Sequence, residues 1–232
     1  MGYAMSTAVV IGGTAGLGRV IAQRRADQGD DVIVAGRDAS RAEAVAKQIG
    51  DRATGLAVDL SKPHGIEEAL AGVGAVDHLV ITAIHQNPNT LANFDIDDAV
   101  TALTTKLVGY AEAVRVLRDR FTPAASVVLF GGLAKERPYP GSTVVTTFNG
   151  GLTGLVRTLA VEIAPHRVNA VHPALIGDSP KWQGIDLSMQ VERTPLGRLV
   201  TMDEVAEAVD FLLRNGGMNA HDLYVDGGVL VR

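Results

Sequence analysis

The feature that most constrains the fold is a regular alternation of short apolar runs with longer amphipathic segments. The apolar runs predict strands at 8–11, 31–35, 56–58, 78–81, 126–130, 168–171 and 223–225. Helical periodicity between them predicts helices at 16–28, 40–49, 66–72, 97–120, 143–164 and 204–214. Apolar strands that alternate with helices are typical of a parallel sheet covered on both faces. We therefore predict an α/β fold with a doubly wound sheet of about seven parallel strands and helices on both faces.

A glycine-rich turn follows the first predicted strand, with Gly12, Gly16 and Gly18 as its key positions. Glycine permits a tight turn and lets backbone N–H groups approach a pyrophosphate at a helix N-terminus. Because the turn lies between a buried strand and a helix, it predicts a dinucleotide site in a Rossmann-like sheet. The chain has no Gly-Lys-Ser/Thr sequence, which argues against a nucleoside-triphosphate loop.

The end of the second predicted strand indicates which dinucleotide binds. Arg37 stands there, and a guanidinium can fork onto a 2′-phosphate that a carboxylate would repel. We therefore expect NADP(H) rather than NAD(H). Asp38 is the alternative ribose ligand, or else the cap of the following helix. Asp59, after the third strand, could accept a hydrogen bond from the adenine amino group or cap the turn that follows.

Composition excludes several classes of protein. The 232 residues have a net charge of −5 and no cysteine, which argues against nucleic-acid partners, disulfides and thiolate sites. No apolar run approaches the roughly 20 residues that span a membrane. The six histidines are scattered, so no metal site is expected.

We predict a cytoplasmic protein with one dinucleotide-binding domain over 1–232, no membrane partner and a short leader at 1–7. Residues 1–6 also fit the loose N-myristoylation pattern, but no polybasic patch follows.

Several ordered motifs resemble the short-chain dehydrogenase/reductase family along nearly the whole chain. The glycine turn has that family's spacing, and Val58-Asp59-Leu60 resembles its adenine-side motif. The segment 167–174 is similar to its "RVNAVxPG" strand, with Ala174 in place of the final glycine. The segments 195–198, 204–206 and 224–228 match its carboxyl end. The resemblance implies a nicotinamide-dependent oxidoreductase, which acts on a small carbonyl or alcohol substrate.

The family's catalytic residues are replaced. Alignment with the family's Ser-Tyr-Lys pattern puts Gly132 where serine belongs, Val145 where tyrosine belongs and Asn149 where lysine belongs. Lys106 stands at the position of an asparagine that the family directs toward the active site. The chain contains no Tyr-x-x-x-Lys sequence, so the usual proton donor is absent.

Three residues are candidates for the missing catalytic role. Lys106 and Tyr110 lie four apart on a predicted helix, so they share a face, and an ammonium there could polarise a carbonyl or lower the phenol pKa. The alternative is an ion-paired lysine and a tyrosine that packs between helices. His85 follows the fourth strand and titrates in the useful range, although it could equally be a surface histidine. Tyr139, in the loop after the fifth strand, could contact substrate or pack in a turn.

The remaining expectations concern the cofactor contacts, the substrate and assembly. The expected cofactor contacts are Gly12, Thr14, Gly16, Leu17, Gly18, Arg37, Asp59, Leu60, Ala83, Asn149 and Ile176. The loops 84–96, 131–142 and 173–200 are the expected substrate walls, with an apolar contribution from Trp182, Leu187 and Met189. Apolar residues on more than one face of the helices at 97–120 and 143–164 predict a homodimer or homotetramer.

The sequence thus predicts an NADP(H)-dependent short-chain oxidoreductase with a remodelled active site. Two alternatives stay open, because hydride transfer cannot be read from these residues. One is an NADP(H)-binding protein without redox activity, such as a sensor or partner subunit. The other is an enzyme that shares the fold but catalyses a non-redox reaction.

Overall fold

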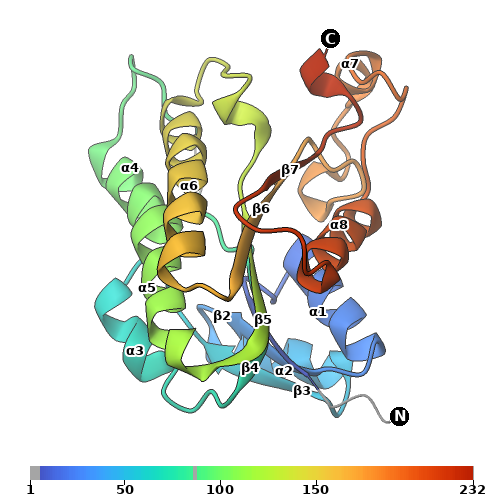
Figure 1. The fold of residues 1–232 in the computed structure, drawn as a ribbon. Helices are drawn as coiled ribbons and strands as arrows, with labels where there is room; N and C mark the ends of the chain where they lie inside the picture. Colours follow the sequence, from blue (N-terminus) through green and yellow to red (C-terminus); the bar gives the residue numbers. More distant parts are fainter. Residues whose placement is uncertain (1–5, 86–87, 232) are drawn as a thin grey trace.

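The computed structural model describes residues 6–85 and 88–231, and its centre is one parallel sheet. The strand order is β3-β2-β1-β4-β5-β6-β7, which is doubly wound and confirms the predicted α/β class (Figure 1). The strands are β1 (Thr7–Ile11), β2 (Asp31–Gly36), β3 (Ala53–Ala57), β4 (Val76–Ile81), β5 (Phe121–Phe130), β6 (Arg167–Pro173) and β7 (Asp222–Val225). The order reverses between β1 and β4, and in such sheets ligands bind at the carboxyl ends beside that reversal.

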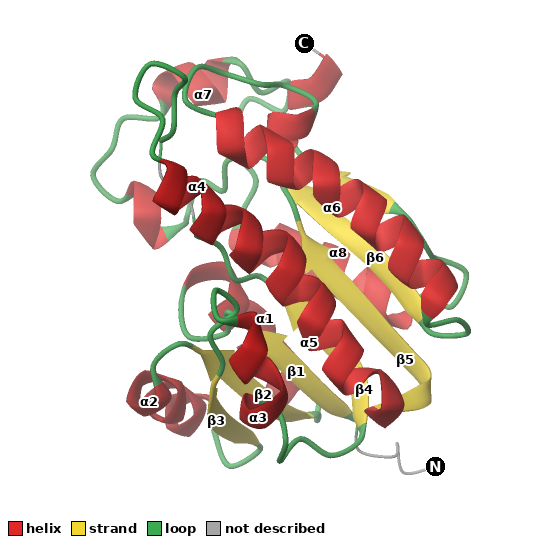
Figure 2. Cartoon of the chain, turned by 90° about the vertical axis from the view of Figure 1, so that its left-hand side faces the viewer, coloured by secondary structure: helices red, strands yellow, loops and turns green. Residues whose placement is uncertain are grey.

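Helices cover both faces of the sheet. They are α1 (Gly16–Asp27), α2 (Ala39–Ile49), α3 (Ile66–Ala69), α4 (Ile96–Leu103), α5 (Gly109–Leu117), α6 (Thr143–Glu162), α7 (Ser188–Glu192) and α8 (Met202–Arg214). Residues of α3, α5 and α6 form a buried cluster on one face of the sheet, and residues of α1, α2 and α8 form a cluster on the opposite face. Figure 2 shows α4 and α5 lying end to end, with α6 alongside them. Within the described residues, no helix has the length and apolar character needed to cross a membrane.

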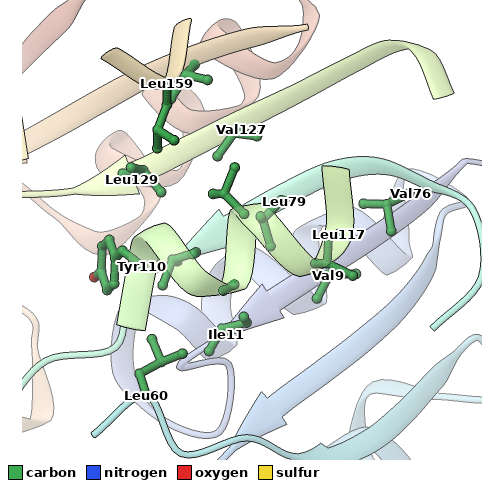
Figure 3. Close-up of a cluster of buried hydrophobic side chains, with 14 of the residues drawn as sticks. Val9, Ile11, Leu60, Val76, Leu79, Tyr110, Leu117, Val127, Leu129 and Leu159 are labelled. Atoms are coloured by element: carbon green, nitrogen blue, oxygen red, sulfur yellow. The ribbon is translucent and has the colours of Figure 1, made fainter. Parts of the chain in front are cut away.

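The central strands are buried because both of their faces meet helices. Val9 and Ile11 of β1 face one cluster, whereas Val10 faces the other. This alternation explains why β1 reads as a continuous apolar run rather than an apolar–polar pattern. Figure 3 shows the first cluster, with Tyr110 at its margin.

The largest departure from the predicted elements is in the helix expected over 97–120. It is divided into α4, a π-helical turn at Thr104–Val108 and α5, and it ends in a short 3₁₀ turn at Arg118–Arg120. A π-turn adds one residue to the hydrogen-bonded ring and is common at functional sites. Apolar periodicity does not reveal it, because the same face stays buried on both sides of the turn.

Two strands begin at least three residues earlier than predicted. β3 begins at Ala53 rather than 56, because Gly55 allows the strand to lie against α2, where a Cβ would stand 2.3 Å from the Glu43 nitrogen. β5 begins at Phe121 rather than 126, and its first residues are too exposed to form an apolar run. The expected helix over 66–72 is a single turn, α3.

The expected leader at 1–7 is wrong at its last residue. Thr7 begins β1, and its backbone N–H donates to Asp77 Oδ2 at 2.8 Å. Ser6 is also described, and its hydroxyl donates to Asp30 Oδ1. The rest of that expectation, including most of the N-myristoylation pattern, falls on residues 1–5, which lie outside the described residues.

Candidate functional site

The glycines of the first turn create close backbone packing at the start of α1. A Cβ on Gly12 would stand 2.5 Å from Thr82 Oγ1, and Gly12 has a φ of +96°. A Cβ on Gly18 would stand 2.2 Å from the Gly12 oxygen. Gly16 meets open space, but its φ of +49° lies in the left-handed region. Glycine is therefore required for steric reasons at 12 and 18 and for backbone conformation at 16.

A cleft of about 460 Å³ runs across this turn. Its lining includes Gly12, Thr14, Leu17, Gly18, Arg37, Asp59, Leu60, Ala83, His85 and Lys106, all of which the sequence predicts as site residues. The sheet order divides the cleft into two halves. Arg37 and Asp59 follow β2 and β3 on one side of β1, whereas Ala83 and Gly131 follow β4 and β5 on the other. A dinucleotide across the switch point would have its adenosine in the first half and its nicotinamide in the second.

The adenosine half carries two arginines. Arg37 and Arg41 both line the cleft, and the sequence analysis missed the second of them. Arg41 lies in the first turn of α2, where acidic residues are usual. A basic residue at that position was the sequence signal that could have identified it. Asp38 is the N-cap of α2 and accepts hydrogen bonds from the Arg41 N–H at 2.9 Å and Ser40 Oγ at 2.7 Å. The Arg41 and Ser40 hydrogen bonds hold the pKa of Asp38 below its ordinary value.

Asp59 caps a turn and also lines the cleft. Its Oδ1 accepts from the Ser61 N–H at 3.0 Å and the Ser61 hydroxyl at 2.7 Å, so it caps the turn after β3. Asp59 also lines the cleft beside Leu60, which is buried. Leu60 sits against the start of α5, where a Cβ on Gly109 would stand 2.4 Å from the Leu60 oxygen.

The nicotinamide half contains a buried lysine. Lys106 is 2% exposed, lines the cleft and donates from Nζ to the Tyr110 hydroxyl at 3.0 Å. Its Nζ also lies 4.8 Å from the Tyr110 ring centre and 5.7 Å from that of Phe148. No salt bridge of Lys106 occurs among residues 6–85 and 88–231. An ammonium has three N–H donors, so two remain for a ligand in the cleft.

Burial controls the protonation of this lysine. It lowers the pKa of Lys106 from 10.5 to about 7, because the charged form has lost its water without gaining a carboxylate. Lys106 therefore exchanges its proton near neutral pH. A group with that pKa is well suited to donate a proton to a developing alkoxide.

Tyr110 positions Lys106 from the buried side of the cleft wall. Its hydroxyl donates to the Ala83 oxygen at 2.8 Å while accepting from Lys106 Nζ. Tyr110 is fully buried, does not line the cleft, and burial raises its pKa well above the ordinary value. The structure thus brings the predicted pair together but encloses the phenol, which makes Tyr110 a positioning residue rather than a group that touches a ligand.

His85 also lines the nicotinamide half, at the end of β4. Its Nε2 lies 2.6 Å from Asp98 Oδ1 of α4, and its side chain is 31% exposed. This contact with the carboxylate fixes the orientation of the ring. His85 therefore faces the cleft, but its ring is held by a contact with Asp98 of α4.

A second cleft of about 800 Å³ joins the first at Ile84 and Gly131. Gly132, Val145 and Asn149, which the sequence predicts at the family's Ser-Tyr-Lys positions, all line it. A Cβ on Gly132 would stand 3.2 Å from Asn149 Nδ2. Asn149 is 2% exposed, and its Oδ1 has no hydrogen-bond partner within the described part of the chain. A buried amide oxygen without a partner indicates a position that a ligand hydroxyl would satisfy.

The turn after β5 rests on a buried histidine. His172 Nδ1 accepts from the Gly132 N–H at 3.2 Å, and its Nε2 lies 2.7 Å from Asp222 Oδ1. Nδ1 accepts this hydrogen bond and therefore carries no proton, and burial lowers the pKa of His172. Gly131 must be glycine, because a Cβ there would stand 2.3 Å from His172 Nδ1. The sequence offered no signal for this support beneath Gly132.

The remaining predicted residues are distributed over both clefts. Ile176 and Asn149 line the larger cleft rather than the smaller one, and Gly16 lines neither. Tyr139 and Trp182 line the larger cleft. Leu187 and Met189, which were predicted for the apolar wall, are absent from its lining, and Met189 is 55% exposed. Leu133, Leu175 and Leu199 supply the apolar wall instead.

The residues present fit a bound nicotinamide dinucleotide. Gly12 and Gly18 form a cradle that a Cβ would fill, Arg37 and Arg41 offer cations at the adenosine end, and Asn149 offers an unsatisfied oxygen at the other end. This fold and site define a dinucleotide-binding protein of the doubly wound class.

Comparisons with known proteins agree with that class. The family model described as enoyl-(acyl carrier protein) reductase matches residues 12–230. A 3-oxoacyl-[acyl-carrier-protein] reductase from Bos taurus is 30% identical over 228 residues, which cover 95% of this chain and 96% of that protein. Carbonyl reductase family member 4 from Danio rerio is 30% identical, with 96% of this chain and 97% of that protein covered. A solved short chain dehydrogenase/reductase family protein is 30% identical, with a TM-score of 0.87 and 98% of each chain covered.

The chain therefore belongs to the short-chain dehydrogenase/reductase family and is an oxidoreductase of that type.

Proposed function

We propose that this protein reduces a carbonyl group with NADPH as the hydride source, and that Lys106 performs the role of the family's missing tyrosine. The observation that carries the proposal is a buried lysine in the nicotinamide half of the cleft that has no acid partner among residues 6–85 and 88–231. Burying such a charge costs stability, and charged side chains are rarely buried unless they are paired. A catalytic role explains why the lysine is there.

The preference for NADP(H) rests on Arg37 and Arg41. Both line the adenosine half, while the competing carboxylate of Asp38 is occupied by the α2 amide and Ser40. Two guanidinium groups favour a 2′-phosphate over a free ribose hydroxyl. The glycines at 12 and 18 would admit the pyrophosphate, and Asn149 Oδ1 would accept from a hydroxyl of the nicotinamide ribose.

The chemistry assigned to this chain's residues is proton delivery and orientation. NADPH, when bound, would supply a hydride for the carbonyl carbon. Lys106 Nζ holds the proton that the carbonyl oxygen takes, and the lysine regains a proton from solvent afterwards. Tyr110 fixes the position of Nζ through its bond to the Ala83 oxygen. Val145 has no polar atom and only shapes the wall.

The test compares Lys106→Met with wild type on a panel of ketones and aldehydes, following NADPH absorbance. Methionine retains the length and apolar stem of lysine without its charge. We expect turnover to fall by roughly 10²-fold or more, with NADPH affinity largely unchanged. Lys47→Met is the matched control, because Lys47 is an exposed lysine of α2 outside both clefts.

Two outcomes would overturn the proposal. Full turnover in Lys106→Met would remove Lys106 from the mechanism and direct attention to His85. A wild-type protein that binds NADPH tightly but reduces no member of the panel would instead be a nucleotide-binding protein without this activity.

A further inference from the structure

The larger cleft carries an uneven set of charges. Arg137, Lys181 and Arg193 line it, together with one acid, Asp226. The three cations come from different segments: the loop after β5, the 3₁₀ turn Pro180–Trp182, and the residue after α7. The whole chain has a net charge of −5, so this concentration of positive charge is local and opposite in sign to that of the protein.

The single acid does not neutralise these cations. Asp226 Oδ1 accepts from the Gly228 N–H at 2.9 Å, and its Oδ2 accepts from the Leu230 N–H at 3.0 Å. Arg137 donates to a neutral group, the Val229 oxygen, at 2.7 Å. Over residues 6–85 and 88–231, the salt bridges found involve none of the three cations. Lys181 instead lies over the Trp182 ring, with Nζ 4.8 Å from its centre.

Much of the remaining lining of the larger cleft is apolar. Val145, Leu133 and Leu199 contribute aliphatic surface, and Trp182 contributes its ring. A volume of about 800 Å³ accommodates a ligand of the size of a small organic molecule. A ligand that satisfies this lining has an apolar body and an anionic end.

We propose that the larger cleft binds an organic carboxylate, an oxo acid whose apolar chain lies along Leu133 and Leu199 and whose carboxylate is bound by Arg193 and Lys181. The inference rests on the proposed carbonyl reduction for the oxo group, while the anion subsite rests on the cations alone. Arginine binds a carboxylate through paired N–H donors, and the low-dielectric wall beside it strengthens that attraction.

Trp182 provides a direct probe, because it is the only tryptophan of the chain and lies in the cleft. Its fluorescence is titrated with 2-oxooctanoate and with 2-octanone, which has a similar chain and no charge, and calorimetry provides a second measure of binding. We expect the acid to bind at least about tenfold more tightly than the ketone, with the difference shrinking as salt is added.

Arg193→Gln should weaken the binding of 2-oxooctanoate at least about fivefold and leave the binding of 2-octanone unchanged. Arg157→Gln removes the same charge from an exposed position of α6 outside the cleft. It should leave the affinity for both ligands unchanged. Equal affinities of wild type for acid and ketone would overturn the subsite, as would an equal loss in both variants.

The subsite and the proposed reaction fail separately. Selective binding of the acid without any NADPH oxidation would support the subsite and contradict the reaction. Oxidation of NADPH by 2-octanone as efficiently as by the acid would support the reaction and overturn the subsite.

Discussion

Replacement of Lys106 by methionine is expected to stabilise the protein even as it removes activity. The pKa of Lys106 falls from 10.5 to about 7 on burial, and one pKa unit corresponds to about 1.4 kcal/mol. Burial of the charge therefore costs up to roughly 4 kcal/mol at neutral pH. The hydrogen bond to Tyr110 returns about 1 kcal/mol of that, so we expect Lys106→Met to raise the free energy of unfolding by about 1–3 kcal/mol.

The pH dependence has a definite sign. Between about pH 7 and 10.5 the unfolded chain holds a proton that folded Lys106 has lost, so the free energy of unfolding rises with pH in this window. Lys106→Met lacks that contribution. The stability gap between the variant and wild type should therefore be largest at or below pH 7 and should narrow toward pH 10.

Urea unfolding of both proteins at pH 7 and pH 9 measures this gap. Lys47→Met, on exposed α2, should stay within about 0.5 kcal/mol of wild type. A less stable Lys106→Met protein at pH 7, or a gap that does not change with pH, would refute the idea that an uncompensated charge is buried there.

Three further expectations follow from the same geometry. Arg37→Ala should weaken NADPH binding by roughly tenfold or more and leave NADH binding unchanged, as dissociation constants would show; equal wild-type affinity for both cofactors would contradict this. Tyr110→Phe removes the acceptor of the Lys106 ammonium, so the activity profile should move to lower pH, and an unmoved profile would exclude the positioning role. Ile96 and Val100 of α4 are 66% and 57% exposed, so we expect a dimer or tetramer by light scattering, and a monomer at micromolar concentration would contradict that.

The sheet could be predicted from the sequence because its signals are local. Each of these signals predicts an element from a few neighbouring residues alone. Examples are the apolar run at 8–11, the glycines at 12, 16 and 18, and the strand at 168–171. The adenosine half of the cleft could be predicted for the same reason, because Arg37 directly follows a strand and lines that half.

What the sequence could not show depends on contacts between distant segments. Lys106 and Tyr110 share a helix face in the sequence, but the bond from Tyr110 to the Ala83 oxygen, which encloses the phenol, joins α5 to the end of β4. The π-turn around Lys106 leaves no mark in the apolar pattern. The support of Gly132 by His172 spans 40 residues, and it appears only when β5 and β6 lie side by side.

The most direct test of the central role given to Lys106 is the pH profile of NADPH oxidation by wild type with saturating carbonyl substrate. If the Lys106 ammonium donates the proton, the rate is constant at low pH and falls about tenfold per pH unit above a midpoint near 7, because the acid form is lost. A rate that is flat through that range, or that rises with pH, would contradict proton donation by Lys106.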